Sequence, residues 1–271
     1  MNQLLAKLFI FLFLYLSVNS KAFSSEKVVS VVSLLDYAPY VFVDKKQPVK
    51  GVISTENNTK LVTGYSWDVF IESFLVMGYS IEYTIVPWPR AIRLLEYGHV
   101  DLLFPISKSE ERLSIYSYSK ESVNATDYII YLPKNTTIKW SGYDSLNGKV
   151  IGVKREYHYG KKFESFNNVT KYDVGNISDG FQMLEKGRID GFIGYQASWD
   201  YVLKQKGWEF KFKKTPVLDS NLEYVVSRKG VEKNERLLQV YDDGKRKLIE
   251  NGKLSELKVK WFGLDKGELI E

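Results

Sequence analysis

The sequence predicts an α/β fold in which mostly parallel sheets are covered by helices on both faces. Apolar runs of strand length alternate along the chain with segments whose apolar residues recur at helical spacing. A helix–glycine–strand phrase occurs twice, as LEYGHVD at residues 95–101 and as LEKGRID at residues 184–190. The repeat indicates two similar lobes that face each other across a cleft. Such junctions are common, however, so one match also arises by chance, and 271 residues suit either one large domain or two modest ones.

The first 22 residues have the features of a secretory signal peptide. Lys7 precedes the apolar run at residues 8–18, and the small residues Ser20 and Ala22 stand at the spacing of a signal-peptidase site. We expect cleavage near residues 22–24. A membrane anchor is the alternative, but the run has about 11 residues and a spanning helix needs roughly 20.

Composition excludes several kinds of site. The chain contains no cysteine, so disulfides, thiolate metal sites and a lipid-modified N-terminal cysteine are excluded. The net charge is only +5 and the lysines are scattered, which argues against nucleic acid as a partner. His99 and His158 are far apart in the sequence, so we expect no metal and no cofactor. An exported, unanchored chain without disulfides suits the periplasm of a two-membrane bacterium.

The first half of the chain begins with a β-branched strand at residues 28–35, which ends in a polar and aromatic turn at residues 36–40. Residues 45–63 form a loop or hairpin. A helix begins at residues 64–68, and a second strand alternates apolar and polar residues over residues 81–85. The helix has one buried face, formed by Trp67, Phe70, Ile71, Phe74 and Leu75.

Residues 87–112 contain the segment that most clearly predicts a ligand site. A helix ends near Gly98, where a left-handed residue is needed, and residues 100–104 then form a buried strand. A polar loop follows and ends in Arg112. Open α/β sheets bind ligands at the carboxyl ends of their strands, and arginine can hold a carboxylate with two parallel hydrogen bonds. The alternative is a surface ion pair of Arg112 with Glu110 or Glu111. The helix that ends near Gly98 has an apolar face, which consists of Ala91, Ile92, Leu94 and Leu95.

The second half repeats this alternation. We expect strands at residues 128–132 and 150–153, a helix capped by Ser178 or Asp179, and extended chain again at residues 225–226. Two helices follow. The apolar positions of the first are Leu237, Leu238, Tyr241, Leu248 and Ile249, and those of the second are Leu254, Leu257 and Trp261.

Seven short segments, in order along the chain, resemble those of the family 3 periplasmic solute-binding proteins, whose members bind polar amino acids for ABC transporters. The resemblance implies the type II periplasmic-binding-protein fold, with a ligand cleft at a two-strand hinge. Lobe 1 would comprise residues 27–123 plus 224–271, and lobe 2 residues 124–223. The segments are DYAPY at 36–40, GYSWDV at 64–69, GHVDLLF at 98–104, SKSEER at 107–112, NGKVIGV at 147–153, GRIDGFI at 187–193 and ENGKLSELKVKWFG at 250–263.

The resemblance also implies site roles in lobe 1. Arg112 stands where the family's arginine grips the α-carboxylate of the ligand, and Ser107 stands where a hydroxyl assists it. Tyr37 and Trp88 match positions that sandwich the ligand's side chain. Trp88 lies between two prolines, so a packing role in the core is its alternative interpretation.

In lobe 2 the chain departs from the family pattern. Tyr157 and His158 stand where small hydroxyls and backbone amides usually meet the carboxylate. Tyr195 stands five residues after Asp190, where amino-acid binders place an acid for the α-ammonium, and a tyrosine carries no negative charge at neutral pH. The segment from Asp101 to Arg112 is one residue shorter than usual. The expected cleft, aromatic and cationic, suits an organic anion at least as well as a zwitterion, and ring faces also hold cations.

We therefore expect a monomeric periplasmic protein that binds a small polar or anionic organic solute without chemistry and delivers it to the membrane permease of an ABC transporter. Two alternatives remain open. One is an enzyme of the cyclohexadienyl dehydratase type, for which Glu156 and His158 are the acid–base candidates. The other is a sensory binding protein that signals through a separate membrane sensor. Asp101 and Asp190 fit turn or capping roles better than ligand contacts.

Overall fold

The computed structural model describes residues 27–43, 49–57, 61–155 and 157–263. The predicted signal peptide at residues 1–22 and its cleavage site lie outside the described residues, as does Glu156, one of the two acid–base candidates. In the part of the chain that the structure describes, no helix combines the length and the apolar character needed to cross a membrane.

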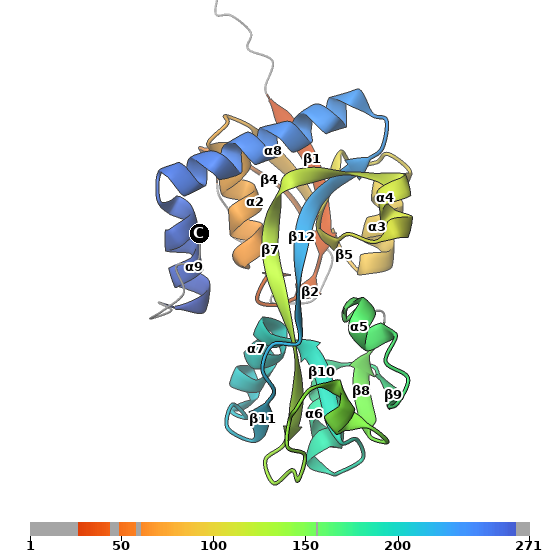
Figure 1. The fold of residues 1–271 in the computed structure, drawn as a ribbon. Coiled ribbons are helices and arrows are strands. Elements are labelled where there is room, and N and C mark those ends of the chain that lie inside the picture. The colour runs from red at the N-terminus through yellow and green to blue at the C-terminus, as the bar shows by residue number, and fades with distance from the viewer. Residues whose placement is uncertain (1–26, 44–48, 58–60, 156, 264–271) are drawn as a thin grey trace, which may run out of the picture.

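A mixed sheet of ten described strands runs through the molecule in the order β4-β5-β1-β6-β12-β7-β10-β8-β9, with β11 also paired to β7. Its central strands, β7 and β12, lie antiparallel and run from the upper half of the molecule into the lower half (Figure 1). The strands are β1 (Val28–Leu34), β4 (Val49–Ile53), β5 (Ser80–Val86), β6 (Leu102–Ser107), β7 (Tyr116–Pro133), β8 (Val150–Lys154), β9 (Thr170–Val174), β10 (Gly191–Tyr195), β11 (Phe212–Lys214) and β12 (Asp219–Arg228).

Each half contains a group of parallel strands that borders antiparallel strands, on both sides in the upper half and on one side in the lower half. In the upper half β1 pairs in parallel with β5 and β6, and in the lower half β8 pairs in parallel with β9 and β10. Strand β4 and the two crossing strands pair antiparallel. A small ribbon of β2 (Asp36–Tyr37) and β3 (Val41–Phe42) follows the carboxyl end of β1 and places Tyr37 between the two halves.

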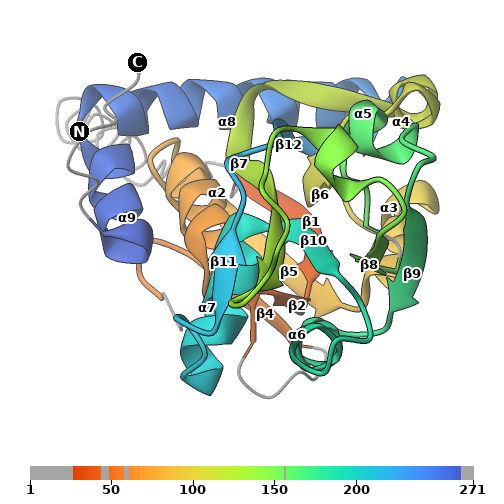
Figure 2. The ribbon, with the colours of Figure 1, turned by 60° about the horizontal axis from the view of Figure 1, so that its bottom comes forward.

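Helices cover both faces of the upper sheet, as the sequence predicts. Helices α2 and α9 lie on one side of the central strands, and α3 and α4 lie on the other (Figure 2). The alternation of strand side chains divides the core accordingly, since Val31 packs in the large cluster with α2 and α8, whereas Val32 packs with α3. The helices are α2 (Tyr65–Leu75), α3 (Trp88–Glu96), α4 (Glu110–Ile115), α5 (Gly160–Glu164), α6 (Ile177–Glu185), α7 (Gln196–Lys206), α8 (Glu232–Glu250) and α9 (Lys253–Phe262), with a 3₁₀ turn η1 (Tyr143–Leu146).

The repeated phrase has the same structure in both halves. Helices α3 and α6 end at Gly98 and Gly187, whose φ angles of 73° and 65° are left-handed. The aspartate three residues later then accepts a backbone N–H from the neighbouring strand, Asp101 from Ser30 at 3.1 Å and Asp190 from Val150 at 2.8 Å. These carboxylates fix one strand against the next, so both aspartates have structural partners.

Four local predictions differ from the structure. Residues 49–53 form the edge strand β4 and not part of a loop or hairpin, because they pair with β5, which lies beyond α2. Arg112 lies in the short helix α4, whose N-cap Ser109 accepts the Arg112 N–H. Helix α6 is capped by Asn176, not by Ser178 or Asp179, because the Asn176 side chain reaches the Asp179 N–H at 2.8 Å. Ile249 is 51% exposed, since it lies beside the buried stripe of α8 and not on it.

Candidate functional site

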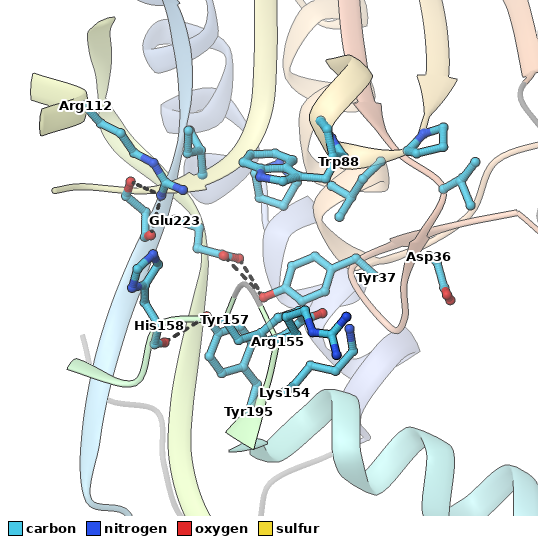
Figure 3. A pocket seen from close by; sticks show the side chains of 17 residues that line it. Asp36, Tyr37, Trp88, Arg112, Lys154, Arg155, Tyr157, His158, Tyr195 and Glu223 are labelled. Carbon is cyan, nitrogen blue, oxygen red and sulfur yellow. Dashed lines mark hydrogen bonds between the residues drawn. The ribbon is translucent and has the colours of Figure 1, made fainter. Parts of the chain in front are cut away.

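One cavity of about 350 Å³ lies between the two halves, within the usual size range of small-molecule sites (Figure 3). Side chains from both halves line it, and all seven residues predicted from the sequence are among them. These are Tyr37, Trp88, Ser107 and Arg112 from the upper half, and Tyr157, His158 and Tyr195 from the lower half.

Arg112 is positioned at the cavity by contacts within the upper half. Its Nη1 donates to the Ser107 hydroxyl at 3.0 Å and to the Ser107 carbonyl at 3.1 Å. Its guanidinium carbon lies 5.9 Å from the centroid of the Trp88 ring, a cation–π distance. Glu110 pairs with Lys161 instead, and among the described residues no acid forms an ion pair with Arg112. The guanidinium therefore keeps Nη2 and Nε for an acceptor from outside these contacts.

Three tyrosines form a continuous aromatic surface across the two halves. Tyr37 of β2 makes edge contacts with Tyr157 at 6.5 Å and with Tyr195 at 6.2 Å between ring centroids, and Tyr157 lies 4.9 Å from Tyr195. Burial raises the pKa of all three hydroxyls well above 10, so the rings stay neutral at physiological pH. They supply apolar surface and hydroxyl groups but no charge.

His158 lies at the rim of the cavity. Its side chain is 67% exposed, and Nδ1 lies 3.0 Å from the Glu164 carboxylate. The Tyr195 hydroxyl donates to the His158 carbonyl at 3.0 Å. The hydroxyl of Tyr195 thus holds the loop that carries Tyr157 and His158. Tyr195 itself also lines the cavity.

Glu223 is the principal site residue that the sequence analysis missed. It lies on β12, lines the cavity and is only 7% exposed. The Tyr37 hydroxyl donates to its two oxygens at 3.2 and 3.1 Å, and Asn124 Nδ2 donates to Oε2 at 2.7 Å. Asn124 is oriented in turn by Ser66, whose hydroxyl donates to Asn124 Oδ1 at 2.8 Å. This chain of hydrogen bonds fixes the carboxylate toward the cavity (Figure 3).

Near neutral pH the Glu223 carboxyl is partly protonated and partly ionised, since its pKa is about 7. Burial raises the pKa of its carboxyl from 4.5 to about 7, while the hydrogen bonds from Asn124 and Tyr37 and the positive charge of Arg112 oppose that rise. No ion pair joins Arg112 to Glu223 among the described residues, although the two charges influence each other. The cavity thus presents a cation and an acid side by side, with space between them.

The sequence did contain a signal for Glu223. The residue interrupts an apolar run, Leu222 to Val226, and a carboxylate within a buried strand requires partners. Other charged lining residues were also missed: Asp36 of β2 directly precedes Tyr37, Lys154 is the last residue of β8, and Arg155 follows it.

Comparison with protein families gives one match over most of the chain. The model of bacterial extracellular solute-binding proteins, family 3, matches residues 29–264. Two curated proteins of Bacillus subtilis (strain 168) are similar at the sequence level. The L-cystine-binding protein TcyJ is 24% identical over 218 residues, which cover 75% of this chain and 77% of that protein. The L-cystine-binding protein TcyA is 21% identical over 230 residues, which cover 84% and 79%.

Solved structures share the fold. A mutant of ArgBP from T. maritima matches with a TM-score of 0.66 at 21% identity, over 88% of this chain and 96% of that one. A histidine kinase sensor domain with similarity to periplasmic binding proteins matches with a TM-score of 0.69 at 19% identity, covering 88% and 97%. The substrate binding protein of an amino acid ABC transporter matches with a TM-score of 0.65 at 20% identity, covering 88% and 100%. These matches confirm the predicted periplasmic-binding-protein fold.

Proposed function

Because the chain belongs to the bacterial extracellular solute-binding proteins, family 3, and solute binding is the function of that family, we propose that its cavity holds a small amino-acid-like or anionic organic solute. We further propose that the chain delivers this solute to the membrane permease of an ABC transporter. The family resemblance predicted from the sequence is thereby confirmed. The names of the similar proteins support an amino-acid-like ligand, since two refer to L-cystine and one to an amino acid ABC transporter.

The geometry of Arg112 is the observation that carries this proposal. The guanidinium faces the cavity, one nitrogen is held by Ser107, and no described acid pairs with it. A positive charge held in place and left without an ionic partner favours an anion in the cavity. A carboxylate fits the planar fork because it accepts two parallel hydrogen bonds.

The ring surfaces would contact the uncharged part of the solute. Trp88 lies beside Arg112 in the upper half, and Tyr157 lies opposite in the lower half. Tyr37 and Tyr195 would complete the enclosure from either side of the gap. Stacked or edge contacts with rings stabilise an apolar or planar group without requiring a charge.

Binding would work by closure of two lobes. In this proposal residues 27–123 plus 224–271 form lobe 1, residues 124–223 form lobe 2, and β7 and β12 serve as the hinge. A solute that contacts Arg112 and Ser107 on one lobe and Tyr157, His158 and Tyr195 on the other stabilises the closed form only. Export through the predicted signal peptide, a periplasmic location and a monomeric state complete the proposal.

A thermal-shift screen of the chain from Phe23 onward tests the proposal. The panel contains amino acids that include L-cystine, dicarboxylates, aromatic acids, polyamines and short peptides. At a ligand concentration 1,000 times Kd, stabilisation reaches about 4 kcal/mol, which is easily measured. We expect a hit among amino acids or organic acids whose stabilisation Arg112→Ala clearly reduces. Stabilisation by polyamines alone, or no hit at all, would contradict the proposal. Conversion of prephenate-like substrates by the purified chain would favour the enzyme instead.

A further inference from the structure

Glu223 lines the cavity beside the residues assigned to the anion, and its position suggests a role of its own. We propose that Glu223, on the crossing strand β12, binds a cationic group of the solute, an ammonium, so that the solute is a zwitterion whose two charges lie between Arg112 and Glu223. This inference rests on the proposed function and specifies its ligand class. It assigns the ammonium contact to a crossing strand and not to the position of Tyr195, where the family pattern places an acid.

Strand register places Glu223 beside the anion-binding side chains. Its Cα pairs with Ser107 on β6 and with Asn124 on β7, so it lies between a strand of the upper half and the other crossing strand. Ser107 is the residue that holds Arg112. The acid and the cation are therefore presented next to each other, which matches an α-amino acid head group, where the carboxylate and the ammonium are attached to the same carbon.

The Glu223 carboxylate can accept hydrogen bonds from a further donor. A carboxylate offers about four lone-pair positions. Tyr37 and Asn124 donate to it from one side, and these are its only partners among the described residues. Because Asn124 is fixed by Ser66 and Tyr37 by its ring contacts, the carboxylate does not have to be ordered when a ligand arrives. Its remaining acceptor positions are directed at a donor in the cavity.

Charge balance supports a cation at this position. A buried carboxylate beside an anion site would repel a purely anionic solute and thereby weaken its binding. The titratable groups that interact with Glu223 are Arg112 and five tyrosines, Tyr37, Tyr40, Tyr128, Tyr157 and Tyr195. Burial raises the pKa of each tyrosine, so all five are neutral, and Arg112 is the side chain assigned to the solute's carboxylate. An ammonium would compensate the Glu223 charge, and so Glu223 and Arg112 would each have a partner on the solute.

Matched ligand pairs test the inference by calorimetric titration. The probes are L-cystine against dithiodipropionate, and L-glutamine against glutaramate, since the second member of each pair lacks only the amino groups. They are titrated into the unaltered chain, into Glu223→Gln, and into Asp127→Asn as the matched control. Asp127 is an exposed acid on β7 that bonds Ser220 and does not line the cavity. Glutamine at position 223 keeps the size of the side chain and an acceptor for Asn124.

We expect at least one amino acid to bind the unaltered chain about 100-fold more tightly than its desamino partner, because truncating a buried charge pair has an effect of that order. Glu223→Gln should remove most of that difference, and Asp127→Asn should preserve it. Equal or tighter binding of the desamino acids, with no weakening in Glu223→Gln, would overturn the inference but leave the anion site intact. Binding of neither class, together with no hit in the thermal-shift panel, would overturn the proposed function, and the inference with it.

Discussion

The Tyr37 hydroxyl donates hydrogen bonds of 3.2 and 3.1 Å to the two carboxylate oxygens of Glu223, a residue 186 positions later in the chain. This contact joins the turn after β1 to the crossing strand β12. It fixes a ring of the aromatic surface and the buried acid of the cavity with respect to each other. Several measurable properties depend on this pair and on its neighbour Arg112.

Arg112→Ala should weaken the binding of a carboxylate ligand about 10-fold to 100-fold. The reason is that a charge-assisted hydrogen bond contributes about 1.5–3 kcal/mol. Titration calorimetry with the best ligand of the screen measures this change. Arg236→Ala is the control, because Arg236 is an exposed arginine on α8 that pairs with Glu232. Equal losses in both variants would contradict the assignment of Arg112.

The stability of the ligand-free chain should depend on pH through Glu223. Its pKa is raised by burial to about 7, above its value in the unfolded chain, so the folded state holds the proton more tightly. The stability that protonation confers is complete below about pH 4.5 and is lost as the pH rises to about 7, a change of about 3 kcal/mol. Glu223→Gln should lack this loss.

Denaturant unfolding of both chains between pH 4 and pH 8 measures the effect. We expect the stability of Glu223→Gln relative to the unaltered chain to increase across this interval and to level off above it. A difference between the two chains that stays constant with pH would show that Glu223 titrates normally.

Tyr37→Phe should raise the pKa of Glu223 further, because the Tyr37 hydroxyl bond favours the ionised carboxylate. The pH interval over which the free energy of unfolding falls should then extend to higher pH. Tyr40→Phe is a matched control, since the Tyr40 hydroxyl donates to the Ala125 carbonyl and not to Glu223. A shift of equal size in both variants would mean that the hydrogen bond from Tyr37 has no specific effect.

Gly244→Ala should destabilise the chain by about 1–3 kcal/mol. An added Cβ on α8 would lie 1.9 Å from the Ser73 carbonyl oxygen of α2, so the two helices would have to separate. Gly175→Ala is the control, because that glycine is exposed and has no atom within 4 Å of an added Cβ. Thermal unfolding of both variants measures the difference, and equal stabilities would contradict the close packing of α2 against α8.

The sequence predicted those features that depend on neighbouring residues. Apolar periodicity identified α2 and β5, and Gly98 identified the end of the helix before β6. A position of Arg112 at the ligand site was predicted because this residue follows the carboxyl end of a predicted strand. The family resemblance, and not a local pattern, predicted Tyr195 at the cavity, where its hydroxyl bonds the His158 carbonyl.

Features that depend on the pairing of strands far apart in the sequence could not be predicted from local patterns. Glu223 reaches the cavity only because β12 pairs with β6 on one side and with β7 on the other. The register of those pairs places it beside Ser107 and Asn124, and no local pattern near residue 223 specifies either partner. The proposed ammonium contact therefore depends on strand pairing, whereas the proposed anion contact could be predicted from a single local segment.

The most direct test of the proposed site is a crystal structure of the chain from Phe23 onward with its tightest-binding solute. The account predicts one solute in the cavity, with its carboxylate about 3 Å from the Arg112 guanidinium and an uncharged part between Trp88 and Tyr157. An amino group should lie within the same distance of Glu223. A solute bound outside this cavity, or within it but turned away from Arg112, would contradict the account.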